Sequence, residues 1–227
     1  MCSRQVFVAS AEIAAAFNLI DDAQKEEMII GAPTDATPMI TLQEPNKLQY
    51  FRWGYPWFEQ SGKQNITACI RAETAYKKFK RLLDKKNRCL SISNGFLEFA
   101  KNTKDPYYFT AKDQPYTVIA ALWDFTPDTK TGVSENRYAI LTTTPNELVA
   151  KTHDRMPVIL SKAAQAIWMN PNATQEELEA LFVPYDKENM EVKIASKKIN
   201  NSRNKNIKLD NLRDPKDELN PEQGSLF

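Results

Sequence analysis

The sequence predicts an α+β protein in which a curved, mostly antiparallel sheet or barrel-like core is flanked by short helices in a single domain. Short stretches rich in aromatic and β-branched residues are separated by turn-forming segments, which is typical of barrels and curved sheets. Other segments have a helical period or open with a helix cap. A chain of 227 residues is long enough to bury one substantial core.

The predicted strands are short and follow one another closely. The stretch 31–56 contains prolines at 33, 38, 45 and 56 and is expected to be irregular. The aromatic run 50–58 fits a buried corner as well as a surface on which bases stack, and both interpretations stay open. Turns are predicted at 113–115 and 126–135. The expected strands are 4–8, 89–92, 95–99, 107–109, 117–123 and 138–144.

Helices are predicted where apolar residues recur at helical spacing or where a capping residue opens a segment. In the clearest case Ala75, Phe79 and Leu82 share one face, with basic residues opposite. Ser10 is expected to cap the first helix, and Thr174 opens a capping-box pattern that ends at Glu177. The expected helices are 10–17, 71–83, 161–169 and 174–181.

The composition changes near residue 197. Beyond this point Asn, Lys and Asp are frequent and large apolar residues are few. Such a segment cannot bury enough surface to offset the entropy lost on ordering. We therefore predict one domain over 1–197 and a mobile polar tail over 198–227.

The composition also excludes several functional classes. Lys and Arg number 30 against 29 Asp and Glu, so any nucleic-acid site must be a local basic patch. The cysteines Cys2, Cys69 and Cys89 include no CxxC pair, which argues against a disulfide framework and a zinc site. We expect no cofactor and no metal. No window reaches the ~18 apolar residues of a membrane span, so a protein of the reducing cytoplasm is expected.

Cys2 is the first candidate for chemistry. Removal of Met1 would expose a residue that carries a free α-amine and a thiol on adjacent carbons. The amine titrates near ~7.7–8.0 and the thiol near ~8.5, so both are partly nucleophilic at neutral pH. Together they can trap an aldehyde, first as an imine and then as a five-membered thiazolidine. An incidental cysteine at the second position is the plainer alternative.

Two further side chains are suited to proton transfer. His153 is the only histidine of the chain and has Asp154 and Arg155 beside it. Its ordinary pKa suits a proton shuttle, although a lone histidine is more commonly structural. Glu98 lies among apolar residues on a predicted strand. If it points inward its pKa should rise, whereas an outward side chain would only follow the strand's alternation.

Short blocks of residues occur in a recognisable order and spacing. The blocks are CSR at 2–4, APT at 32–34, WGY at 53–55, RAET at 71–74, RC at 88–89, NGFLEF at 94–99, PY at 106–107, AALW at 120–123 and HDRMP at 153–157. Together they resemble the SRAP family, the SOS response-associated peptidases, which are understood as abasic-site processing proteins. The resemblance covers about 2–160 and, more weakly, 192–206.

The resemblance implies a function in the DNA damage response. Cys2 is implied to form a stable thiazolidine cross-link with the ring-opened sugar of an abasic site in single-stranded DNA. Glu98 matches a carboxylate that shuttles protons, and His153 matches a histidine that assists Schiff-base formation and any lyase cleavage by β-elimination. The peptidase activity is implied to be removal of whatever precedes the cysteine, here Met1.

Further residues match positions that contact DNA in the family. Trp53 matches an aromatic residue at the kinked DNA, and Thr142 matches a phosphate contact. The positions that hold phosphates correspond to Arg4, Arg71 and Arg155.

The chain departs from the family pattern at two polar positions. Cys69 and Ile30 stand where asparagines are usual, which puts the rate of cross-linking in doubt more than its chemistry.

Two other functions stay open. One is an N-terminal-cysteine peptidase or amidohydrolase, which needs an oxyanion hole. The other is a non-covalent single-stranded DNA-binding protein.

The C-terminus carries one more motif. Gln223, Leu226 and Phe227 resemble the peptide by which bacterial replication proteins bind the sliding clamp. A polar tether before this motif would let the anchor bind while the domain scans nearby DNA. The alternative is that Leu226 and Phe227 dock back on the domain.

Overall fold

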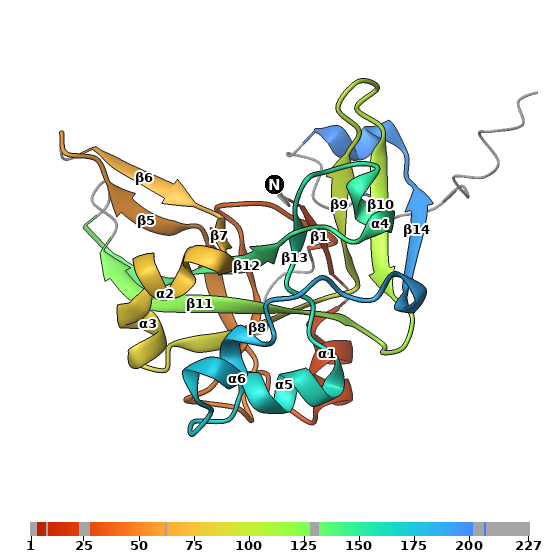
Figure 1. The fold of residues 1–227 in the computed structure, drawn as a ribbon. Helices are drawn as coiled ribbons and strands as arrows, with labels where there is room; N and C mark the ends of the chain where they lie inside the picture. The colour runs from red at the N-terminus through yellow and green to blue at the C-terminus, as the bar shows by residue number, and fades with distance from the viewer. Residues whose placement is uncertain are drawn as a thin grey trace, which may run out of the picture.

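Two β-sheets that share one core form the centre of the molecule (Figure 1). The computed structural model describes residues 4–7, 9–22, 28–61, 63–127, 132–201 and 207. No helix among these residues is long and apolar enough to span a membrane.

The larger sheet closes into a barrel. Its strands follow the order β11-β8-β3-β4-β12, and the pairing of β11 with β12 completes the ring. Four of the five junctions are antiparallel, while β12 and β4 run parallel. The predicted barrel-like core is therefore confirmed. The barrel strands are β3 (Ala36–Thr41), β4 (Gln49–Trp53), β8 (Arg88–Ser93), β11 (Thr117–Pro127) and β12 (Ser134–Thr143).

Strand β12 also carries two short strands beyond the ring. Strand β7 (Cys69–Arg71) runs parallel to it, and β13 (Met156–Pro157) runs antiparallel. Their registers place Arg71, Thr142 and Pro157 in one row across three strands. This row brings the end of β7 close to the segment that precedes β13.

The second sheet is antiparallel and has the order β14-β10-β9-β1-β2. Gly95 in this sheet has no room for a side chain, because a Cβ there would lie 2.3 Å from the Phe109 carbonyl oxygen. A separate hairpin projects from the barrel (Figure 1) and consists of β5 (Tyr55–Phe58) and β6 (Gln64–Thr67). The sheet strands are β1 (Gln5–Val6), β2 (Ile30–Gly31), β9 (Gly95–Phe99), β10 (Pro106–Ala111) and β14 (Met190–Ile194).

The helices are short and lie outside the sheets. The Ser161 hydroxyl accepts a hydrogen bond from the Ala164 amide at 3.3 Å, and the capping box between Thr174 and Glu177 is present. The helices are α1 (Ser10–Phe17), η1 (Ala72–Thr74), α2 (Ala75–Lys78), α3 (Lys80–Asp84), α4 (Glu147–Ala150), α5 (Lys162–Trp168), α6 (Gln175–Glu179), η2 (Lys187–Asn189) and η3 (Lys197–Asn200).

Two helix predictions need correction. The single helix expected over 71–83 is three short ones, because the backbone leaves helical dihedral angles at Thr74 (φ −118°, ψ 6°) and again at Phe79 (φ −124°, ψ 21°). The Phe79 ring packs edge-on against Tyr55 with the ring centroids 5.7 Å apart. At α1 the N-cap is Ala9 and makes no side-chain hydrogen bond, so Ser10 is the first helical residue instead of the cap.

The prediction that 31–56 is irregular was wrong, because β3 and β4 lie inside it. Proline normally interrupts a sheet since it lacks an N–H group. Pro38 is tolerated because it pairs only with Tyr50 of β4, while β3 meets its other neighbour from Met39 onward.

Alternate residues of the barrel strands enter different cores. One cluster lies between the barrel and the helices and includes Leu90 and Ile92, whereas Cys89 belongs to a second cluster with Phe96 and Phe109 of the other sheet. The second cluster therefore joins the two sheets. Packing continues past the predicted domain end at residue 197, since Ile199 is 1 % exposed. Most of the predicted tail, 202–206 and 208–227, lies outside the described residues.

Candidate active site

Glu98 is a buried carboxylic acid on β9. Its side chain is 2 % exposed, and its Oε1 atom makes no hydrogen bond within the described part of the chain. The pKa of Glu98 is raised to about 7, mainly by burial and in part by the nearby Asp154 carboxylate. A buried group of this kind exchanges a proton readily at neutral pH. Of the two orientations that the sequence leaves open, the structure has the inward one.

Strand β1 holds the start of the described chain next to Glu98. Gln5 pairs with Phe96, and the Leu97 amide donates a hydrogen bond to the Arg4 carbonyl oxygen at 3.1 Å. Arg4 is thus fixed by the same strand that carries Glu98. Whatever precedes Arg4 must start from this point.

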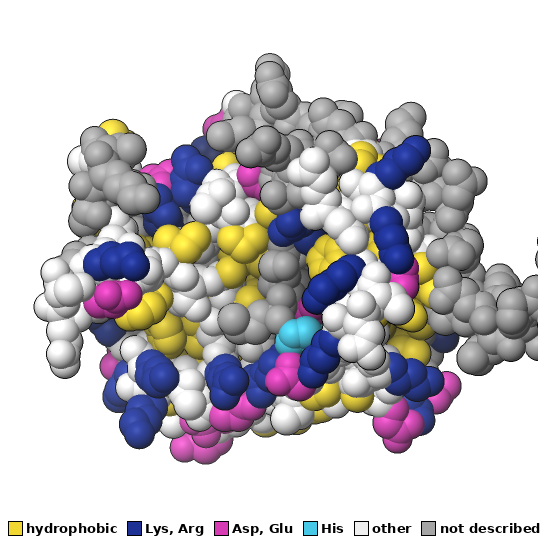
Figure 2. All heavy atoms as spheres, turned by 90° about the horizontal axis from the view of Figure 1, so that it is seen from above, with side chains coloured by type: hydrophobic (Ala, Val, Ile, Leu, Met, Phe, Trp, Pro, Cys, Tyr) yellow, Lys and Arg dark blue, Asp and Glu magenta, His cyan; other side chains and the backbone are white. Residues whose placement is uncertain are grey.

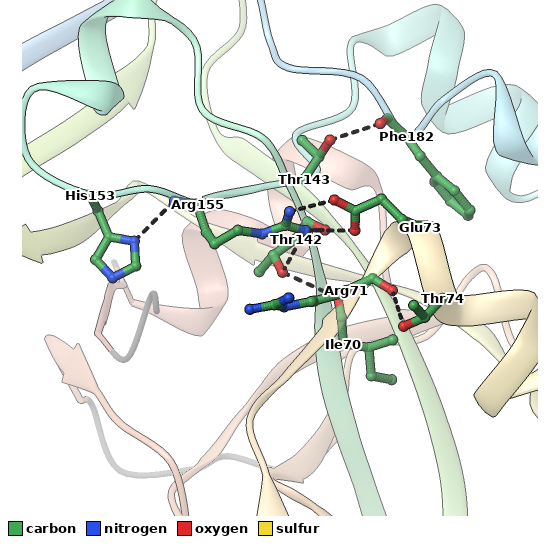
Figure 3. Close-up of polar contacts among 9 residues, drawn as sticks. All are labelled: Ile70, Arg71, Glu73, Thr74, Thr142, Thr143, His153, Arg155 and Phe182. Carbon is green, nitrogen blue, oxygen red and sulfur yellow. Dashed lines mark hydrogen bonds and ion pairs between the residues drawn. The ribbon is translucent and has the colours of Figure 1, made fainter.

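His153 lies in the segment between α4 and β13. Its Nδ1 atom accepts a hydrogen bond from the Arg155 amide at 3.0 Å and lies 3.0 Å from the Asp154 Oδ1 atom (Figure 3). The neutral ring can accept from the amide, whereas the protonated ring can donate to the carboxylate. Burial lowers the pKa of His153 below its ordinary value, so the neutral, proton-accepting form predominates at pH 7.

Arg155 and Glu73 form an ion pair beside the row that crosses β12 (Figure 3). Both guanidinium nitrogens of Arg155 donate to the Glu73 carboxylate, one of them at 2.8 Å, and Nη2 also donates to the Thr142 carbonyl at 2.5 Å. The ion pair with Arg155 lowers the pKa of Glu73. The Arg155 guanidinium is therefore already committed to protein groups, and a phosphate would have to share it with Glu73.

Arg71 differs from Arg155 because its side chain is exposed. It ends β7 opposite Thr142, which is 1 % exposed and donates its hydroxyl to the Ile70 carbonyl at 3.3 Å. Arg71 can thus reach solvent from the position expected of a phosphate contact. Thr142 is buried in the row that crosses β12, and its hydroxyl is not exposed to solvent.

Trp53 is a core residue. Its side chain is fully buried, its indole N–H donates to the Ala68 carbonyl at 2.8 Å, and its ring stacks on Tyr138. In this conformation the Trp53 ring is therefore not exposed for a direct contact with DNA. The buried-corner interpretation of the aromatic run holds for Phe51 and Trp53, whereas Trp57 is 44 % exposed.

The two departures from the family pattern are buried. Ile30 is 2 % exposed and pairs with Val6 of β1. Burial raises the pKa of the Cys69 thiol to about 12, and the charge of Glu98 contributes. Cys69 is therefore a neutral thiol near the buried acid at pH 7.

The structure brings Glu98, His153, Arg71, Arg155 and Thr142 into one region. Figure 2 shows the single histidine (cyan) beside a hollow in the surface, with Lys and Arg side chains (dark blue) on both sides of it. A local basic patch is thus present despite the balanced overall charge. Within the described ranges, no group of His, Cys, Asp and Glu could hold a metal ion.

Some predicted site residues cannot be placed. Cys2 and the clamp-motif residues Gln223, Leu226 and Phe227 lie outside the described residues. Sequence reasoning also missed Glu73 as the partner of Arg155. The available signal was its place two residues after Arg71 in the RAET block.

Comparisons with known proteins give one family. The sequence profile of SOS response associated peptidase (SRAP) matches residues 1–202. The "Abasic site processing proteins" YoaM and YoqW of Bacillus subtilis are each 35 % identical over 72 % of this chain and cover 75 % and 76 % of their own lengths. A crystal structure of a Bacteroides thetaiotaomicron protein matches 86 % of this chain and 93 % of its own, with a TM-score of 0.76 and 27 % identity. A Bordetella bronchiseptica protein at 22 % identity shares the fold, with a TM-score of 0.71, over 86 % of this chain and 100 % of its own.

Proposed function

The chain belongs to the SOS response associated peptidase (SRAP) family, and from this premise we propose that it processes abasic sites in single-stranded DNA. In this proposal Cys2, exposed by removal of Met1, captures the sugar aldehyde as a thiazolidine. The cross-link protects the lesion during the DNA damage response. The names of the Bacillus subtilis relatives support the abasic-site part of this proposal.

The buried acid Glu98 is the observation that carries the proposal. A carboxyl group with a pKa of about 7 and an oxygen that has no partner among the described residues is suited to repeated proton transfer at neutral pH. Cys2 precedes Arg4 by two residues. Arg4 is hydrogen-bonded to the strand that carries Glu98 through the Leu97 amide. The short link from Cys2 to Arg4 supports the proposal, because two residues of extended chain span at most ~7 Å.

The chemistry follows from these groups. Neutral Glu98 donates a proton to the sugar ring oxygen as the ring opens to the aldehyde. The Cys2 amine adds to the aldehyde carbon, and loss of water gives an imine. The thiol then adds to the imine carbon, and its proton passes to the nitrogen, closing the thiazolidine. His153, which is neutral at pH 7, accepts protons released in these steps.

We propose lyase activity as a branch of the same pathway. The imine makes the neighbouring C2′ proton acidic, and its removal by a base expels the 3′ phosphate by β-elimination. His153 is our candidate for this base. We also propose that the peptidase activity of this chain is restricted to exposing Cys2.

The decisive experiment uses the Met-free protein and a single-stranded oligonucleotide with one abasic site. A band that survives a denaturing gel is expected for the parent and for Cys89→Ala, a control cysteine buried in the core. Cys2→Ala should give no such band without reductant, because it lacks the thiol that closes the ring. A stable adduct with Cys2→Ala would rule out the thiazolidine. No adduct with the parent would leave the amidohydrolase or non-covalent alternatives.

We further propose that the C-terminal residues Gln223, Leu226 and Phe227 bind the replication sliding clamp. The two apolar side chains would each contribute roughly 1.5–3 kcal/mol on full burial. A fluorescent peptide covering 215–227 should bind purified clamp, whereas the Leu226→Ala, Phe227→Ala peptide should not. Equal binding of both peptides, or none by either, would eliminate this partner without affecting the cross-linking proposal.

A further inference from the structure

Lys101 lies on the hairpin that carries Glu98. Glu98 pairs with Tyr107 of β10, and the chain turns over residues 100–105 between the two strands. The Ala100 amide donates to the Asp105 carbonyl at 2.9 Å, and the Lys104 amide donates to the Ala100 carbonyl at 3.0 Å. The strands that position Glu98 therefore also position Lys101.

The far side of this turn is held by the helix η3. The Asn200 side chain donates to the Lys104 carbonyl at 2.9 Å, and the Lys197 ammonium group lies 2.9 Å from Asp105. The charge of Lys197 is thus compensated. Lys101 is exposed, and its side chain makes no ion pair with another described residue.

The charge of Lys101 reaches the segment that carries His153. Burial is the main reason that the pKa of His153 is lowered, and Lys101 lowers it further. The pKa of Asp154 is lowered first by His153 and also by Lys101. The turn of the second sheet therefore faces this segment, where basic side chains flank the histidine (Figure 2).

Arg71 and Lys101 approach this region from different parts of the fold. Arg71 ends β7 on the barrel, whereas Lys101 belongs to the β9–β10 turn of the second sheet (Figure 1). A DNA strand that crosses the site carries one phosphate on each side of the abasic sugar. Arg71 and Lys101 are exposed cations on different sheets, whereas the Arg155 guanidinium is bound to Glu73.

We propose that Lys101 binds the backbone phosphate on the side of the lesion opposite to the one that Arg71 binds. The assignment rests on the proposed function, because it requires a DNA strand across the site. It adds a contact from the second sheet to those expected from the barrel. The strand would then be held at both walls while the sugar reacts between them.

The test measures binding to an intact single-stranded oligonucleotide, which cannot cross-link. Lys101→Gln should weaken binding about three- to ten-fold at low salt and make the slope of log K against log salt shallower by about 0.7, as expected for one lost phosphate contact. Lys104→Gln removes the same charge from the same turn and serves as the matched control, expected to bind like the parent.

Equal binding of the parent and Lys101→Gln across the salt titration would overturn the proposal. So would equal losses in both lysine variants, since the effect would then be the general charge of the turn. Failure of the cross-linking proposal would show separately, as the absence of an adduct between the parent and abasic DNA.

The single histidine offers an independent check of the geometry without DNA. Removing the positive charge of Lys101 should raise the pKa of His153 in an NMR titration, whereas Lys104→Gln should leave it unchanged. An unchanged pKa in Lys101→Gln would contradict the placement of this side chain at the site.

Discussion

The barrel and the second sheet treat a buried charge in opposite ways. Arg88 on β8 and Glu98 on β9 are each 2 % exposed and lie on consecutive strands. Arg88 faces the helices, where its guanidinium donates to the Trp168 carbonyl at 2.8 Å and to the Asn170 carbonyl at 2.7 Å. Glu98 belongs to the second sheet, and its Oε1 atom has no partner within the described part of the chain.

This difference separates a structural charge from a reactive one. A buried ion whose hydrogen bonds are satisfied ties elements together, and Arg88 joins the barrel to the end of α5. A buried acid without a partner is poorly stabilised as an anion, so its proton is exchanged near neutral pH. Burial alone does not identify a functional residue, and Glu98 differs from Arg88 because its Oε1 atom has no partner among the described residues.

Glu98→Gln tests the reactive side and should have the largest effect. Loss of a general acid–base group lowers rates about 10²–10⁴-fold, and we expect this loss in cross-link formation or reversal with abasic DNA. The parent rate should fall above pH 7, as Glu98 loses its proton, and the variant should lack this inflection. Quench-flow or gel time courses between roughly pH 5 and pH 9 measure the rate on both sides of this inflection.

The same variant should be more stable than the parent in alkaline solution. The folded pKa of Glu98 is about 7 against an ordinary value of 4.5, so the parent loses stability as the pH rises through this window. The full difference is about 3 kcal/mol. Thermal melts at pH 4 and pH 8 should show a gain for Glu98→Gln only at pH 8. Parallel pH profiles would contradict the assigned pKa.

Arg88→Met tests the structural side and should cost about 3 kcal/mol of unfolding free energy. The reason is that hydrogen bonds to charged groups contribute about 1.5–3 kcal/mol and two carbonyls lose their donor. Urea denaturation measures the change. The folded variant should retain the cross-linking rate of the parent. A slower cross-linking rate with unchanged stability would mean that the structural role of Arg88 and the proposed proton-transfer role of Glu98 are not independent.

Glu73→Gln should have a smaller effect, near 1 kcal/mol, because half of the Glu73 side chain is exposed and solvent screens the pair. The lowered pKa of Glu73 means that its contribution is present above the ordinary value of 4.5 and is lost as the pH falls. The variant and the parent should therefore converge in stability at acidic pH. A constant difference down to pH ~2, well below the ordinary carboxyl pKa, would argue against the ion pair.

Arg71→Ala should change the stability least, since the side chain is exposed. We expect weaker binding to single-stranded DNA and a salt slope shallower by about 0.7. Arg155→Ala should instead lower both stability and binding, because it removes the link between Glu73 and β12. Fluorescence anisotropy at several salt concentrations distinguishes the two. Unchanged binding by Arg71→Ala would remove the phosphate assignment.

Periodicity and turn residues predicted the fold class and six of the strands, namely β1, β8, β9, β10, β11 and β12. Strands that combine alternation with few prolines, such as β9 and β11, were found near their predicted bounds. The strand β3 was missed because Pro38 argues against a strand unless its partner register is known. The break at Phe79 was missed because it depends on a contact with Tyr55, which lies far away in the sequence.

The site could be predicted only in part for a similar reason. Local sequence indicated that Glu98 and His153 were candidates, but not that one would have a raised pKa and the other a lowered one. Those shifts depend on burial between the two sheets. The roles of Arg71 and Arg155 look alike in sequence, and only the ion pair with Glu73 separates them.

The long-range pairing of β1 also sets an order of events during synthesis. Gln5 pairs with Phe96, which the ribosome adds 91 residues later. At about 5–20 residues per second, the first strand waits roughly 5–18 s for this partner. An aminopeptidase would have that interval to act on Met1 before the strand is enclosed, whereas the chain's own proposed peptidase activity requires the assembled fold. The two routes to a free Cys2 are therefore separated in time by the burial of Glu98.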